Sequence, residues 1–124
     1  VDFVLKCLDR MYGGEIFVPK IPSVRIVDLA RAMAPDKEMK IIGIRPGEKL
    51  HEIMCPSDDS HLTIEYDDYF VISPSIVFYS RPNDFTSNAI GEKGVTVKQG
   101  FEYSSGNNPA FLSEKEILEY NRLP

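Results

Sequence analysis

Apolar residues recur at helical spacing over the first twelve positions of the chain and again over residues 24–34. The first segment predicts an amphipathic helix whose apolar face packs into a core. That face consists of Val1, Val4, Leu5, Leu8, Met11 and Tyr12. Gly13 and Gly14 end the helix, because glycine adopts the left-handed cap without steric cost. A short strand at 15–19 follows, and Ser23 is predicted to cap the second helix.

The stretch KIIGIRPGEKLHEIMC, residues 40–55, has the densest local signals. Its apolar run at 41–44 predicts a buried strand, and Pro46-Gly47 predicts a sharp turn. Apolar spacing then predicts a short helix at 48–54. The order strand, helix, strand over 15–44 is typical of an α/β unit with parallel strands and a right-handed crossover.

The second half of the chain predicts mainly strands. Alternating residues at 61–66 and a second apolar run at 69–72 indicate a hairpin that turns at Asp67-Asp68. Residues 73–94 are rich in proline, glycine and asparagine and predict an irregular connecting segment, with 76–79 as a candidate strand. Alternation at 95–103 predicts a further strand, in which Gly100 is a candidate bulge.

The last segment carries a capping box. Ser113 and Glu116 have the S-x-x-E spacing, and Leu112 with Ile117 can form a hydrophobic staple. They predict a structural helix at 114–121. The whole pattern predicts a mixed α/β fold, α+β in isolation, in a single domain over residues 1–124.

Composition narrows the class of protein. The 124 residues are 43% apolar and 27% charged, which is ordinary for one small globular domain. The net charge of −5 argues against a general nucleic-acid binder, and no apolar run reaches the length of a membrane span. The chain does not begin with Met and opens inside a predicted helix, so we expect a fragment of a longer protein. Cys7 and Cys55 are expected to be buried free thiols in a reducing cytoplasm.

Arg45 and Glu48 are the candidate ligand-binding residues. They flank the predicted turn at the carboxyl end of a predicted strand, the edge where open α/β sheets bind ligands. An arginine there can bind phosphate through two parallel hydrogen bonds, and a glutamate can accept hydrogen bonds from sugar hydroxyls. The alternative is a weak surface ion pair, which spacing alone favours.

Other chemistry is weakly indicated. His51 and Cys55 are four residues apart, so a helix would put them on one face, and with His61 they could be metal ligands. The paired C-x-x-C spacing is missing, and a packing or hydrogen-bonded role is favoured. The sequence contains no G-x-G-x-x-G, P-loop, G-x-S-x-G or Tyr-x-x-x-Lys motif. We therefore predict no catalytic, cofactor-binding or metal-binding residue in this chain.

Two long stretches resemble a known family: IFVPKIPSVRIVDLARAM and IIGIRPGEKLHEIMCPSDDSHLTIEYDDYFVI. They are similar to the carboxyl-terminal part of bacterial inverting UDP-N-acetylglucosamine 4,6-dehydratases, which are extended short-chain dehydrogenases/reductases of polysaccharide biosynthesis. The ending, GFEYSSGNNPAFLSEKEI, also resembles those enzymes. The motif R-P-G-E-K-L-H-E is fairly specific, although related dehydratases and dehydratase/epimerases of capsule synthesis carry similar segments.

The resemblance implies roles for Arg45 and Glu48. In this family the arginine and glutamate of R-P-G-E bind the UDP-sugar, so Arg45 would neutralise the diphosphate and Glu48 would accept from a hydroxyl, on the ribose. Lys20 and His51 are weaker candidates for the same cleft, and no family role transfers to them.

The resemblance also implies what lies outside this sequence. The full enzyme is a cytoplasmic lyase that holds NADP on an amino-terminal Rossmann domain, forms a homo-oligomer and makes a 4-keto-6-deoxy UDP-sugar for pseudaminic acid. This chain would be its substrate-side lobe, without the Rossmann domain and inactive alone, with UDP-N-acetylglucosamine and its own Rossmann domain as partners and with no nucleic acid, membrane or metal. Two alternatives stay open, a related dehydratase/epimerase of capsule synthesis and a non-catalytic binding module.

Overall fold

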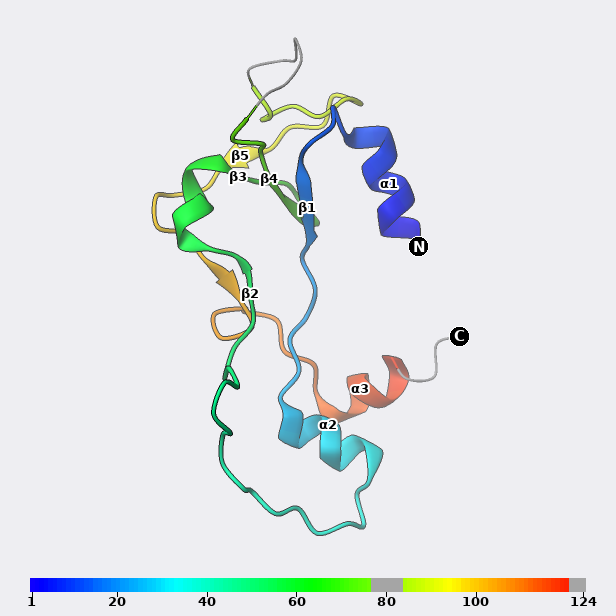
Figure 1. The fold of residues 1–124 in the computed structure, drawn as a ribbon. Coiled ribbons are helices and arrows are strands. Elements are labelled where there is room, and N and C mark those ends of the chain that lie inside the picture. The colour runs from blue at the N-terminus through cyan, green and yellow to red at the C-terminus, as the bar shows by residue number, and fades with distance from the viewer. Residues whose placement is uncertain (77–83, 121–124) are drawn as a thin grey trace. The chain divides into compact units, whose positions relative to one another are not determined.

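The computed structural model describes residues 1–76 and 84–120 (Figure 1). The chain divides into two compact units. Unit 1 comprises Val1–Lys20 and Ile53–Tyr103, and unit 2 comprises Ile21–Glu52 and Ser104–Pro124. The secondary structure is mixed α/β with antiparallel pairing between the strands of its main sheet, which agrees with the predicted mixed class. Whether both units act as one substrate-binding domain, 1–124, stays a prediction.

Unit 1 is built on a four-stranded antiparallel sheet in the order β1-β4-β3-β5. Its elements are α1 (Asp2–Arg10), β1 (Ile16–Pro19), the 3-10 helix η1 (Ser57–Leu62), β3 (Thr63–Glu65), β4 (Tyr69–Ile72) and β5 (Val95–Thr96). The predicted hairpin is confirmed: β3 and β4 pair with Ile64 opposite Val71. Its first strand is shorter than predicted, because η1 occupies residues up to Leu62.

Strand β4 is buried on both faces. Phe70 and Ile72 belong to one apolar cluster with Val18, Cys55 and Tyr103. Successive strand residues point to opposite faces, so Tyr69 and Val71 contribute to a second cluster. That cluster also contains Ile64 and Tyr66, with Phe3, Phe17 and Phe85 packed against it. The continuous apolar run at 69–72 is therefore explained by burial on both sides of the sheet.

The predicted buried face of α1 is wrong. Val4, Leu5 and Leu8 are more than half exposed, while Phe3, Cys7 and Arg10 lie on the less exposed side. Phe3 meets the Tyr69 ring edge-on, with centroids 6.2 Å apart, and Arg10 forms an ion pair with Glu92. These contacts turn the narrower, partly polar side of the helix toward the sheet.

The predicted parallel crossover is also wrong. β1 pairs antiparallel with β4, and residues 34–52 contain no helix or strand (Figure 1). The predicted strand at 41–44 contains Gly43 at φ +80°, a left-handed conformation that interrupts an extended strand. Instead of the predicted helix at 48–54, the chain forms β2 (Ile53–Cys55), which pairs with β6 (Tyr103–Ser104).

The predicted strand at 95–103 is divided. A turn closed by the Phe101 N–H and the Lys98 carbonyl separates β5 from β6, and Gly100 lies in it at φ +77°. Most of the candidate strand at 76–79 lies outside the described residues.

Unit 2 contains two short helices that pack side by side, α2 (Ile26–Met33) and α3 (Glu114–Tyr120) (Figure 1). The predicted cap of α2 is wrong, because the N-cap residue is Arg25. The Ser23 hydroxyl instead accepts a hydrogen bond from the Asn108 side chain. The capping box of α3 is confirmed, since Glu116 accepts from the Ser113 backbone at 2.8 Å and its own N–H donates to the Ser113 hydroxyl at 3.4 Å.

Both cysteines are free thiols. Cys55 is buried, and burial raises its pKa to about 11, whereas Cys7 is half-buried. Over residues 1–76 and 84–120, the helices are too short and too polar to cross a bilayer.

Candidate functional site

The candidate site is a four-residue turn in unit 2, from Arg45 to Glu48. The Glu48 N–H donates to the Arg45 carbonyl at 3.0 Å, and Gly47 has φ +86°. Proline at the second position and a left-handed glycine at the third are the requirements of a type II turn, so R-P-G-E encodes this conformation locally. The predicted turn is confirmed, although it follows an extended coil and not a strand.

Arg45 and Glu48 form an ion pair across this turn. Glu48 Oε1 accepts from Arg45 Nε at 2.7 Å and lies 2.5 Å from Nη2, while Oε2 accepts from the Arg45 backbone N–H at 2.8 Å. The backbone N–H of Arg45, and after it the guanidinium, lower the pKa of Glu48. The Arg45 side chain is 76% exposed. The two predicted site residues are thus held together, and the surface ion pair weighed as the alternative is present.

The chain after the turn is fixed to the loop that follows β6. The Glu52 N–H donates to Ser105 Oγ at 3.1 Å, and the Ser105 N–H donates to the Glu52 carbonyl at 2.9 Å. The His51 ring lies against Gly106, where a Cβ would approach the ring to 2.9 Å. The sequence showed no sign of the contribution of Ser105 and Gly106, because Ser105 lies 53 residues after Glu52, to which it is bonded.

The weaker candidate Lys20 lies in unit 1. Its Nζ is 2.7 Å from Glu65 Oε1 and 4.9 Å from the centre of the Phe70 ring. Both contacts belong to the sheet, and they account for the position of the side chain without a ligand.

The candidate metal ligands Cys55 and His61 have other surroundings in unit 1. Cys55 lies in the buried core of unit 1, and His61 Nδ1 is 3.0 Å from the Asp58 carbonyl. Within residues 1–76 and 84–120, no three His, Cys, Asp or Glu side chains form a set that could hold a metal ion.

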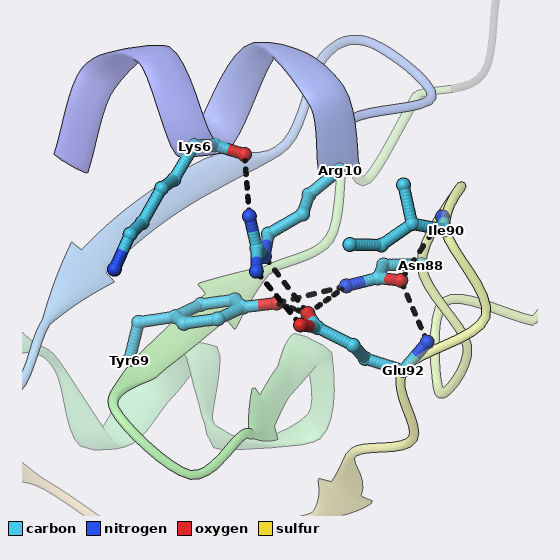
Figure 2. A network of polar contacts seen from close by, with 6 residues as sticks. All are labelled: Lys6, Arg10, Tyr69, Asn88, Ile90 and Glu92. Atoms are coloured by element: carbon cyan, nitrogen blue, oxygen red, sulfur yellow. Dashed lines mark hydrogen bonds and ion pairs between the residues drawn. The ribbon is translucent and has the colours of Figure 1, made fainter. Parts of the chain in front are cut away.

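A second polar cluster, in unit 1, was not predicted. Figure 2 shows the Glu92 carboxylate at its centre: it accepts from Arg10 at 2.8 and 2.7 Å, from Asn88 at 2.6 Å and from the Tyr69 hydroxyl at 3.2 Å. Arg10 and then Asn88 lower the pKa of Glu92 against the effect of desolvation, while burial raises that of Tyr69. These bonds join α1, β4 and residues 88–92, so the cluster has a structural role within unit 1. Its members come from three distant segments, which local patterns do not relate.

Comparison with known proteins gives consistent results. The family model for polysaccharide biosynthesis proteins matches residues 1–74. The chain is 65% and 61% identical, over 96% of its length, to the UDP-N-acetylglucosamine 4,6-dehydratases (inverting) of two Campylobacter jejuni strains, O:2 and O:23/36. It spans 36% of the length of each of these relatives.

A solved structure has a similar fold. The X-ray structure of Pen from Bacillus thuringiensis matches with a TM-score of 0.64 at 25% identity, over 94% of this chain and 33% of that one.

Proposed function

The chain belongs to the family of polysaccharide biosynthesis proteins, and from this membership we propose that it is the UDP-sugar-binding part of an inverting UDP-N-acetylglucosamine 4,6-dehydratase. The identities of 65% and 61% to two such enzymes support this proposal over the related dehydratase/epimerases. They also support it over a non-catalytic binding module, because both relatives are enzymes and each match covers 96% of this chain.

The observation that carries the proposal is the exposed Arg45–Glu48 turn. Arg45 would bind the diphosphate, because its guanidinium is 76% exposed and is the side chain best suited to paired hydrogen bonds with phosphate oxygens. Glu48 belongs to the same site. In unit 2 the surrounding residues 34–52 are all exposed, so a ligand can reach the turn without displacing a core.

The reacting groups belong, in this proposal, to the remainder of the enzyme. That remainder would be a Rossmann domain, where bound NADP would supply the hydride-transfer chemistry of the dehydration. The described residues of this chain supply nucleotide binding, and binding energy from the nucleotide positions the hexose for reaction elsewhere. The chain alone is then inactive, and the full cytoplasmic enzyme, a lyase, would serve pseudaminic acid synthesis as a homo-oligomer.

The exposed side of α1 is where we place the Rossmann domain. Val1, Val4, Leu5 and Leu8 form one apolar stripe and are each at least 56% exposed. Such a stripe gains stability when another apolar surface covers it. This chain does not span about two thirds of the length of the dehydratases that it matches. In this proposal the corresponding part of the enzyme packs on the apolar stripe of α1.

An NMR titration tests the proposed binding. Amide spectra of the chain are recorded with increasing UDP-N-acetylglucosamine, with inorganic phosphate as the ligand control. We expect saturable shifts centred on residues 44–51, and their loss in Arg45→Ala. Arg25→Ala is the matched control, because it removes another exposed unit 2 arginine from outside the turn. Shifts that survive Arg45→Ala, or a well-dispersed spectrum that does not move, would contradict the assignment.

A further inference from the structure

Helix α1 meets the sheet of unit 1 with its less apolar side. Phe3, Cys7 and Arg10 are its partly buried residues, at the i, i+4, i+7 spacing of one helix face. The apolar stripe of α1 lies on the other side, and each of its residues is at least 56% exposed. Hydrophobic burial alone would favour the opposite orientation, because turning the stripe inward removes more apolar surface from water. Other contacts therefore hold the helix as it is.

The polar cluster around Glu92 supplies those contacts (Figure 2). Both carboxylate oxygens of Glu92 accept from the Arg10 guanidinium, at 2.8 Å from Nε and 2.7 Å from Nη2. The side chains of Asn88, which is 6% exposed, and Tyr69 donate to the same carboxylate at 2.6 and 3.2 Å. Nη1 of Arg10 donates to the Lys6 carbonyl of its own helix at 3.1 Å. A guanidinium and a carboxylate joined by two parallel bonds adopt one geometry, so the pair determines which side of α1 faces the sheet.

The cluster is also anchored independently of the Arg10 side chain. Asn88 Oδ1 accepts from the N–H groups of Ile90 and Glu92 at 3.2 and 2.9 Å, which closes the turn that carries the carboxylate. The Ala89 N–H donates to the Arg10 carbonyl at 3.0 Å and joins this turn to the end of the helix. If α1 turned its stripe inward, the carboxylate would lose its cation while the buried Asn88 stayed beside it. Leaving such groups short of partners costs free energy, which opposes that rotation.

We propose that the Arg10–Glu92 pair is a positioning device for domain docking, which holds α1 with its apolar stripe outward, where the rest of the enzyme covers it. This inference rests on the proposed function, since the occupant is the part of the dehydratase relatives that this chain does not span. A conflict between hydrophobic pattern and packing is expected at functional surfaces. A helix already held in the orientation that its partner needs binds that partner more tightly than one that must first be oriented.

Thiol labelling of the chain measures the orientation of α1. Cys7 lies on the inner side and burial raises its pKa, so its reaction with a maleimide becomes faster when that side opens. Cys55 is fully buried and reports unfolding of unit 1. In Glu92→Gln and in Arg10→Met we expect Cys7 to label about two- to fivefold faster, the scale of a partly exposed ion pair, with Cys55 unchanged. Glu65→Gln is the matched control, because it weakens another 2.7 Å ion pair of unit 1 that does not involve α1.

A chimaera tests the docking itself. This chain replaces the matching segment of the Campylobacter jejuni O:2 dehydratase, to which it is 65% identical, and Leu5→Cys provides a probe in the stripe. We expect position 5 to label more slowly in the chimaera than in the chain alone, because the rest of the enzyme covers it. Glu92→Gln should speed up this labelling in the chimaera by about the same factor as that of Cys7. It should leave position 5 unchanged in the chain alone, because Glu92 affects coverage of the stripe only through the orientation of α1.

Two results would overturn the inference. In the first, Cys7 in Glu92→Gln labels at the wild-type rate, or becomes faster only together with Cys55, so the pair does not orient the helix. In the second, position 5 is protected in the chimaera and Glu92→Gln leaves that protection intact, so docking does not need the pair. Failure of the proposed function, which places the rest of the enzyme on the stripe, looks different. Position 5 would then label as fast in the chimaera as in the chain alone, whatever the rate at Cys7.

Discussion

Strand β4 in unit 1 and residues 34–52 in unit 2 contain similar apolar residues in opposite environments. Each residue of β4 is buried, whereas Ile41 and Ile42 are 86% and 76% exposed. β4 pairs with β1 on one side and β3 on the other, and each of its two faces contributes to an apolar cluster. Residues 34–52 contain no strand. An apolar run therefore does not by itself determine burial; the strand partners supplied by distant segments do. The exposed region is also the one whose polar groups remain open to a ligand.

The largest expected effect is a cavity in the buried region. Phe70 is 4% exposed and its ring packs within 5.2 Å of Phe101 and 5.0 Å of Tyr103, measured between ring centres. Phe70→Ala should lower the free energy of unfolding by about 3–5 kcal/mol. Urea denaturation followed by circular dichroism measures this loss. Ile41→Ala is the control and should change stability by less than about 0.5 kcal/mol. Equal losses would remove the contrast between the two regions.

Substitution of one glycine in each region tests the comparison further, and we expect the larger loss of stability at Gly94. A Cβ there would lie 2.6 Å from Ile64 Cγ2 and 2.8 Å from a Tyr66 ring carbon. Gly94→Ala should therefore overpack unit 1 and cost about 1–3 kcal/mol in denaturant unfolding. Unchanged stability would mean that the sheet moves freely at this point.

Gly47 has space around it but an unfavourable backbone. Nothing lies within 4 Å of its Cβ position, and its φ of +86° strains any L-residue. Gly47→Ala should cost about 1 kcal/mol, concentrated in the turn. The change is measured as amide shifts confined to residues 44–51 with weaker UDP binding. Shifts spread over the sheet of unit 1 would contradict a local effect.

The smallest expected effect is the loss of stability at acid pH when Glu92 is protonated. Interactions with Arg10, and then with Asn88, lower the pKa of Glu92 in the folded chain below 4.5. Its contribution to stability is therefore complete above pH 4.5 and is lost as the pH falls through the lowered value. The wild type should lose more stability between neutral pH and the acid range than Glu92→Gln does, by less than about 1 kcal/mol. Unfolding curves at a series of pH values measure the difference, and parallel curves would contradict it.

The sequence correctly predicted the features that depend on interactions between residues close together in the chain. The capping box of α3, the hairpin of β3 and β4 and the R-P-G-E turn each depend on residues within a few positions of one another. The candidate residues Arg45 and Glu48 could be named for the same reason.

The rest depends on distant partners. The strand predicted at 41–44 has no strand partner within the described residues, and Gly43 takes a left-handed conformation there. The side of α1 that meets the sheet is selected by Tyr69 and Glu92, some 60 to 90 residues later, which contact Phe3 and Arg10. The Ser105 contacts that anchor the end of the turn segment are equally remote, so no local pattern contains them.

The exposed segment 34–52 has a consequence for chain cleavage. It carries Lys37, Lys40 and Lys49, three exposed sites for trypsin. β1 and α2 precede the segment, whereas their pairing partners β4 and α3 follow it. A single cut there leaves β1 and α2 in one fragment and their partners β4 and α3 in the other. The nicked chain should thus persist as a non-covalent heterodimer, and the segment is a natural place to split this protein into halves that reassemble.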